Sequence, residues 1–197
     1  MAAISNAKVV ILATHGFEQS ELQVPQQKLR DAGAHVVVVS PEKGQIRGWK
    51  NKDWGESVTV DKSLDEVSAD DYDALVLPGG QINPDLLRIN AQALQLIRDF
   101  LDAGKVVAAV CHAPWLLIEV DAVRDKQVTS YKSIKTDVIN AGGKWIDREV
   151  VADRGLITSR NPGDLDAFSA KIIEEIQEGS HSRQRARTKG EPRPSAH

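Results

Sequence analysis

Cys111 is the one cysteine of this 197-residue chain, and its surroundings are those of a nucleophile. It follows the apolar run Lys105–Val110 and precedes the apolar, helix-like segment Pro114–Val120, so it lies at a strand-to-helix junction. Ala109 and Ala113 stand two positions before and after it, as in the sharp turn that holds a nucleophile on a strained backbone. The positive end of the following helix favours thiolate over thiol. We therefore predict that Cys111 carries the chemistry, and we regard a merely packed cysteine as the weaker interpretation.

His112 is a candidate for two different tasks. Its side chain could move a proton, but adjacency alone does not aim it at the sulfur, so an ordinary surface histidine remains open. Its backbone N–H has a clearer role, because the amide after a nucleophile commonly donates to an oxyanion. Gly79-Gly80 follows the run Tyr72–Leu77 and exposes backbone that could supply the second donor or form only a turn.

Two carboxylates, Glu18 and Asp85, stand at predicted helix starts. Glu18 could tune the cysteine, but the helix dipole alone explains an acid there. Asp85 follows Asn83-Pro84, and a cap, a proline and an acid are typical of the first turn of a helix. His15 and His35 have no metal-ligand partners in register, so we expect no metal and no cofactor.

The elements that position these residues alternate between strand and helix. Apolar runs predict strands at Lys8–Ala13, His35–Ser40, Tyr72–Leu77, Lys105–Val110 and near Val128. A hairpin or an edge excursion is expected over Gln45–Val60, and a short hairpin over Glu149–Thr158. Helical patterns cover about Glu18–Ala32, Pro84–Ala103, Ile134–Ala141 and Asp164–Gln177. This alternation predicts an α/β fold, a doubly wound, mostly parallel sheet with helices on both faces. The candidate residues then follow strands, at the edge of the sheet where such folds bind ligands.

Composition limits the class of protein. With 41% hydrophobic and 27% charged residues, the chain fits a single domain over residues 1–178. Residues 179–197 are basic and lack apolar periodicity, so we expect a flexible tail. The net charge of -3 and the pI near 6.0 provide no basic field for nucleic acid or a membrane surface. Without a signal sequence or an apolar stretch of about 18 residues, we expect a cytoplasmic protein.

Five groups of residues, in this order, identify a family. They are Gly16-Phe17-Glu18 with Glu21-Leu22, Tyr72-Asp73-Ala74-Leu75-Val76-Leu77-Pro78-Gly79-Gly80, Ala109-Val110-Cys111-His112-Ala113-Pro114, Thr129-Ser130-Tyr131, and Thr158-Ser159-Arg160 with Pro162, Asp164 and Leu165. With them the chain resembles the ThiJ/PfpI superfamily over about residues 8–178, and within it the branch of PfpI-type intracellular proteases and general stress proteins. The resemblance implies the flavodoxin-like fold shared with class I glutamine amidotransferases.

The resemblance also implies residue roles. Cys111 would be the nucleophile, Glu18 a carboxyl hydrogen-bonded to its sulfur, and His112 the general acid and base. Asp85 of a neighbouring subunit would orient His112, so the site would be shared in a homodimer or higher homo-oligomer.

Gly80 and the His112 amide match the family's oxyanion donors, with Gly79 beside them. Two positions depart from the family pattern. Ala113 replaces the glycine of the usual Cys-His-Gly-Pro turn, and His15 stands where an acid is frequent. Either departure could narrow the pocket or alter its electrostatics, which bears on the choice of substrate rather than on the identity of the nucleophile.

Three functions compete. The first is a cysteine-dependent hydrolase or lyase acting on a small carbonyl substrate, a peptide or a glycated protein, since family members are described as peptidases, glyoxalases and deglycases. The second is a redox-sensing stress protein or chaperone that works through reversible oxidation of Cys111. The third, a glutamine amidotransferase, needs a late catalytic histidine, and after Val150 only His181 and His197 of the tail remain. We set the third aside.

Overall fold

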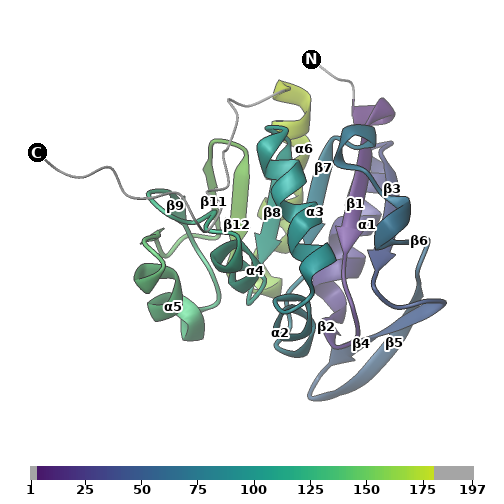
Figure 1. Cartoon of the computed structure of the whole chain (residues 1–197), viewed down its shortest axis with the longest axis horizontal. Coiled ribbons are helices and arrows are strands. Elements are labelled where there is room, and N and C mark those ends of the chain that lie inside the picture. The colour runs from purple at the N-terminus through teal and green to yellow at the C-terminus, as the bar shows by residue number, and fades with distance from the viewer. Residues whose placement is uncertain (1–3, 180–197) are drawn as a thin grey trace, which may run out of the picture.

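The computed structural model describes residues 4–179, and its centre is a seven-stranded sheet with helices on both faces (Figure 1). The strand order is β11-β12-β8-β7-β1-β3-β6. All neighbouring pairs run parallel except β11 with β12. The bounds are β1 (Lys8–Leu12), β3 (His35–Ser40), β6 (Lys62–Ser63), β7 (Ala74–Leu77), β8 (Val106–Val110), β11 (Val150–Asp153) and β12 (Leu156–Ser159). The predicted doubly wound α/β fold is confirmed, while the predicted tail lies, apart from Gly179, outside the described residues.

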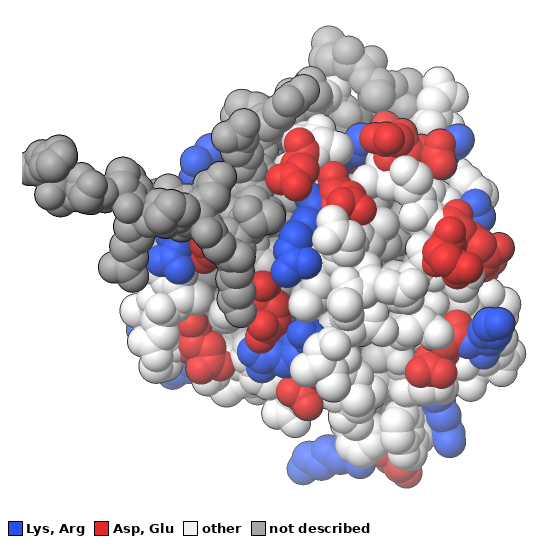
Figure 2. Space-filling view, viewed as in Figure 1, with Lys and Arg blue, Asp and Glu red and all other residues white. Residues whose placement is uncertain are grey.

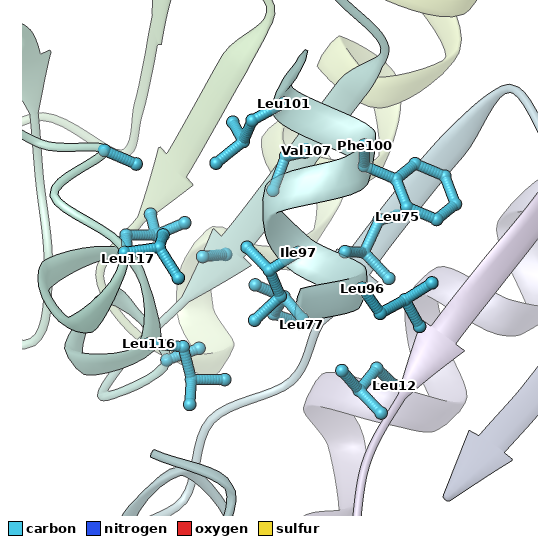
Figure 3. Close-up of a cluster of buried hydrophobic side chains, with 14 of the residues drawn as sticks. Leu12, Leu75, Leu77, Leu96, Ile97, Phe100, Leu101, Val107, Leu116 and Leu117 are labelled. Carbon is cyan, nitrogen blue, oxygen red and sulfur yellow. The ribbon is translucent and has the colours of Figure 1, made fainter. Parts of the chain in front are cut away.

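The central strands are apolar throughout because they are buried on both faces. In β1, Val10 and Leu12 face one core cluster, whereas Val9 and Ile11 face the other. The first cluster packs against α3 (Ala91–Asp102) and α4 (Pro114–Glu119). The second packs against α1 (Gln19–Asp31) and α6 (Leu165–Glu178). Figure 3 shows the first cluster, where Ile97, Phe100 and Leu101 of α3 lie over β7 and β8.

Two smaller sheets flank the main one. β2 (Phe17–Glu18), β4 (Gln45–Lys50) and β5 (Asp53–Thr59) form a three-stranded sheet in the order β2-β4-β5, which confirms the predicted hairpin. β9 (Gln127–Val128) pairs with β10 (Lys144–Trp145), and α5 (Lys135–Asn140) lies beside this pair. On the face shown in Figure 2, acidic and basic side chains are interspersed. No helix among residues 4–179 is both long enough and apolar enough to cross a membrane.

The prediction of a single helix over Pro84–Ala103 is wrong. The segment forms two helices, α2 (Ile82–Leu87) and α3, because Asn90 takes an extended conformation and its side chain caps α3 by accepting the Ala93 N–H at 3.0 Å.

Asn83, predicted to cap the helix, instead lies inside α2 and is buried. Its Oδ1 accepts the Thr14 N–H at 2.7 Å, and its Nδ2 donates to the carbonyls of Pro78 and Gly79. This one side chain thereby joins the loop after β1 to the loop after β7.

Candidate active site

The loops that follow β1, β7 and β8 meet at the carboxyl ends of these strands and enclose a pocket of about 560 Å³. Cys111, His112, Glu18, Glu21 and Gly80 are among the residues that line it. The predicted loops therefore do come together, as expected for the ligand edge of a doubly wound sheet.

Cys111 has a strained backbone. Its φ is +65°, a left-handed conformation that costs a non-glycine residue about 1 kcal/mol or more. Neighbouring segments fix it there, since its N–H donates to the Ser159 carbonyl at 3.0 Å and its carbonyl accepts the Tyr131 N–H at 2.8 Å. A Cβ at Gly79 would lie 2.7 Å from the Cys111 Cβ, so only glycine permits this approach. The sulfur is held at the predicted sharp turn.

The carboxyl beside the sulfur belongs to Glu21. Its Oε2 accepts the Gly79 N–H at 2.8 Å, and its Oε1 is buried without a nitrogen or oxygen partner among the described residues. The Cys111 thiol lies within hydrogen-bonding range of this carboxyl. Burial raises the pKa of Glu21 to about 8, so its neutral form prevails at pH 7.

The protonation of Glu21 controls the thiol. Burial raises the pKa of Cys111, and a negative charge on Glu21 raises it further. A protonated Glu21 removes that repulsion and can donate its O–H to the thiolate, while the N–H groups of Gly80 and His112 also stabilise the thiolate. The arrangement therefore lowers the cost of ionising Cys111 while Glu21 keeps its proton.

Glu21 corrects the prediction that Glu18 bonds the sulfur. Glu18 precedes α1, lines the pocket and accepts a hydrogen bond from the Ser20 hydroxyl at 3.3 Å, and burial raises its pKa. Glu21 lies instead on the buried side of α1, in line with Pro25 and Leu29 at intervals of four residues. An acid within the apolar stripe of a helix is the sequence signal that could have identified it.

His112 is aligned with the sulfur despite its adjacency to Cys111. Its Nδ1 lies 3.1 Å from the Cys111 Sγ, and its Nε2 lies 3.1 Å from the Ser133 Oγ. The Tyr131 ring stacks on the imidazole at 4.8 Å, and Trp115 packs edge-on at 5.2 Å. Burial lowers the pKa of His112, so the ring is neutral at pH 7. With Nε2–H donated to Ser133, Nδ1 is free to accept the thiol proton. Sequence reasoning missed Ser133, because nothing in its local pattern indicates a contact across 21 residues.

The oxyanion donors agree in part with the prediction. The N–H groups of Gly80 and His112 are directed at the sulfur, so they lie beside the position that the oxygen of an attacked carbonyl would take. The N–H of Gly79 is not available, because it is bonded to Glu21. This corrects the placement of Gly79 among the donors.

Asp85 lies apart from the cysteine within its own chain. It is exposed on α2, and its carboxylate forms no hydrogen bond or ion pair within residues 4–179. Its role in a neighbouring subunit stays a prediction.

The two departures from the family pattern do not narrow the pocket. Ala113 packs in the first core cluster, and the His15 Nδ1 accepts the Arg47 N–H at 3.0 Å. Neither residue is part of the pocket wall. In the described part of the chain, no group of three or more His, Cys, Asp or Glu side chains could hold a metal ion.

The chain is similar in sequence and in structure to several known proteins. The model of the DJ-1/PfpI family matches residues 7–175. The chain is 43% identical to "Deglycase PfpI" of Pyrococcus furiosus over 84% of this chain and 97% of that protein. It is also 43% identical to "Protein/nucleic acid deglycase 2" of Escherichia coli, over 84% and 95%. The crystal structure of Drosophila melanogaster DJ-1beta superposes with a TM-score of 0.79 at 30% identity, covering 88% of this chain and 95% of that one.

The raised pKa of Glu21 predicts a pH-dependent stability. Unfolded Glu21 loses its proton near pH 4.5, while folded Glu21 keeps it to about pH 8. The stabilisation is therefore complete below pH 4.5 and is lost as the pH rises to about 8. A difference of one pH unit between the folded and unfolded pKa corresponds to about 1.4 kcal/mol of stability.

Glu21→Gln should flatten this decline when the free energy of urea unfolding is measured from about pH 4.5 to 8.5. The exposed control Glu149→Gln should keep the wild-type decline, and parallel curves for all three proteins would refute the assignment.

The contact between His112 and Ser133 predicts a positioning role for the hydroxyl. Ser133→Ala removes the acceptor for Nε2–H, and losing a hydrogen bond of about 1 kcal/mol should slow alkylation of Cys111 by iodoacetamide at pH 7 roughly fivefold. Ser133→Thr, which retains a hydroxyl, should restore most of the rate. Thr136→Ala deletes an exposed hydroxyl from the same region and is the control. Equal rates for Ser133→Ala and Thr136→Ala would show that the hydroxyl does not orient the ring.

Proposed function

Since the chain belongs to the DJ-1/PfpI family, we propose that it is a cysteine-dependent hydrolase or lyase of carbonyl compounds, with deglycase activity as its principal reaction. The observation that supports this most is the strained Cys111, whose Sγ lies 3.1 Å from an imidazole nitrogen and faces two backbone donors. A site with a nucleophile, a base and an oxyanion hole is suited to attack on a carbonyl carbon.

The geometry supports a sequence of proton and bond changes. His112 Nδ1 accepts the Cys111 proton, and the thiolate forms a bond to the carbonyl carbon while the π electrons move to the oxygen. The N–H groups of Gly80 and His112 stabilise this oxyanion. On a peptide bond, re-forming the C=O bond expels the amine, which takes the imidazolium proton, and water then releases the acyl group from the sulfur. On a methylglyoxal adduct, the amine or thiol leaves with that proton and the carbon that bore it becomes bonded to the sulfur. A proton then moves from this carbon to the neighbouring carbonyl carbon, and water hydrolyses the resulting thioester to lactate.

The choice of deglycase rests on the relatives. Two proteins that are 43% identical to this chain over most of its length are named as deglycases. Peptidase and glyoxalase activities use the same attack on a carbonyl, so they are the alternatives that an assay must separate. A cytoplasmic location suits the proposal, because a reducing compartment keeps a catalytic thiol free.

A second candidate function, redox sensing through Cys111, is favoured by Glu21. A neutral carboxyl beside the sulfur can donate a hydrogen bond to a sulfinate as well as to a thiolate. The alignment of His112 on the sulfur supports the enzyme instead, because a sensor needs no base.

Asp85 supports the further proposal that the site is shared in a homo-oligomer. Two large apolar residues that follow Asp85 in the chain are exposed, Leu86 by 47% and Ile89 by 83%. Exposed apolar surface of this kind marks a contact with another protein. A partner's Asp85 would approach the Nε2 edge of His112, beside Ser133, and would stabilise the imidazolium.

The central proposal predicts turnover that depends on Cys111. Wild type and Cys111→Ala would be assayed on methylglyoxal, a glycated amino acid and an unstructured fluorogenic peptide, with the amine buffer varied to exclude scavenging. Wild type should release the free amino acid from the glycated one, and Cys111→Ala should lower that rate about 10³-fold or more. Full activity of Cys111→Ala would contradict the mechanism. Absence of any turnover, together with oxidation of Cys111 by mild peroxide, would favour redox sensing.

Sharing of the site predicts complementation between two inactive chains. Asp85→Asn and Cys111→Ala homo-oligomers should both be impaired, but co-expression with two affinity tags should give mixed oligomers in which the intact Cys111 meets an intact Asp85. We expect recovery of up to about half of the wild-type activity per dimer, since one of two sites is complete. Pairing Asp85→Asn with the double variant Cys111→Ala, Asp85→Asn should restore nothing. A fully active Asp85→Asn homo-oligomer would exclude the shared site.

A further inference from the structure

The tip of the β4–β5 hairpin forms part of the pocket. Asn51 and Lys52 are the two turn residues between these strands, and both line the pocket together with Trp49. Figure 1 shows the hairpin extending beyond the main sheet, beside β2. Lys52 thus lines the same cavity as Cys111.

Lys52 occupies a backbone conformation in which lysine is unfavourable. Asn51 has φ +51° and Lys52 has φ +68°, the conformation of a two-residue turn that prefers asparagine followed by glycine. Asparagine tolerates this region, but a lysine has a Cβ that crowds the backbone there. An unfavourable residue at a binding cavity indicates that its side chain has a use.

The hairpin is held against α1. The Gln19 Oε1 accepts the Glu56 N–H at 2.8 Å, and a Cβ at Gly55 would collide with this same oxygen. Trp49 and Trp54 pack edge-to-face with their ring centroids 5.5 Å apart. These contacts place the turn at a defined position on the cavity wall.

The charge on Lys52 has no partner in the described chain. Lys52 forms no hydrogen bond or ion pair through its side chain within residues 4–179. The titratable groups that share its cavity are Glu18, Glu21, Cys111, His112 and Tyr131. Burial raises the pKa of Glu21 and lowers that of His112, so both are neutral at pH 7. Glu18 accepts a hydrogen bond from the Ser20 hydroxyl and forms no ion pair with Lys52. Among the described residues that line the cavity, Lys52 is therefore the one lysine or arginine that could bind an anionic group of a substrate.

We propose that Lys52 binds a carboxylate of the substrate, so that the site prefers carbonyl adducts of amino acids with a free carboxylate over their neutral amides. The ammonium group would bind this carboxylate while the reacting carbon lies at the Cys111 sulfur, and the Trp49 ring would cover the apolar part between them. This inference rests on the proposed function and names the substrate class for the same site.

The test compares two substrates that differ only in charge, the methylglyoxal adducts of N-acetylcysteine and of N-acetylcysteinamide. Lys52→Gln should raise the KM for the carboxylate roughly tenfold at low salt, leave its kcat unchanged and leave the amide unaffected, since one charge-assisted hydrogen bond is lost. Lys52→Arg should retain the preference. Lys50→Gln makes the same charge change on the same hairpin, at a residue outside the pocket wall, and should leave both substrates unchanged.

A second variant separates recognition from folding. Lys52→Gly should raise the melting temperature, because glycine accepts a φ of +68°, and should still lose the preference for the carboxylate. Equal effects of Lys52→Gln on both substrates, or none on either, would overturn the inference while the turnover itself upholds the enzyme. If wild type turned over neither adduct, the proposed function would fail instead.

Discussion

The close approach of the loop after β7 and of helix α1 to the turn at Cys111 is the constraint on which the rest of the site depends. The sulfur can face the Gly80 and His112 amides only because the residue that follows β8 is left-handed and no side chain stands at Gly79. The same missing side chain leaves room for Glu21, whose carboxyl touches both segments. The strained backbone, the buried acid and the oxyanion donors therefore all depend on the same close packing around Gly79 and Cys111.

Much of this could be predicted from the sequence because it is encoded locally. The apolar runs that became β1, β3, β7 and β8 are continuous, which is the pattern of strands buried on both faces, so the parallel sheet followed from periodicity and from the connections. The position of Cys111 after β8 fixed it at the ligand edge of the sheet for the same reason.

The rest depends on which way side chains point in three dimensions. Glu18 and Glu21 are both acids near the start of one helix, and only the direction of its buried face distinguishes the one that reaches the sulfur. The contact of Ser133 with His112 joins residues far apart in the chain, and so does the hydrogen bond from the Thr14 N–H to the buried side chain of Asn83. No local pattern specifies such pairs. The break at Asn90 was the exception, because its capping side chain is a local signal within an otherwise helical run.

The pocket is built from two sheets that differ in how neighbouring elements hold them. Cys111, His112 and Gly80 follow β7 and β8, which pair with neighbouring strands on both sides. Asn51 and Lys52 come from a hairpin that is held outside the main sheet by β2 and α1. Insertions or deletions at the hairpin tip would leave the register of the main sheet intact. Evolution can therefore remodel what the protein recognises while the reacting atoms stay in place, which makes the hairpin the segment where relatives with the same nucleophile can diverge.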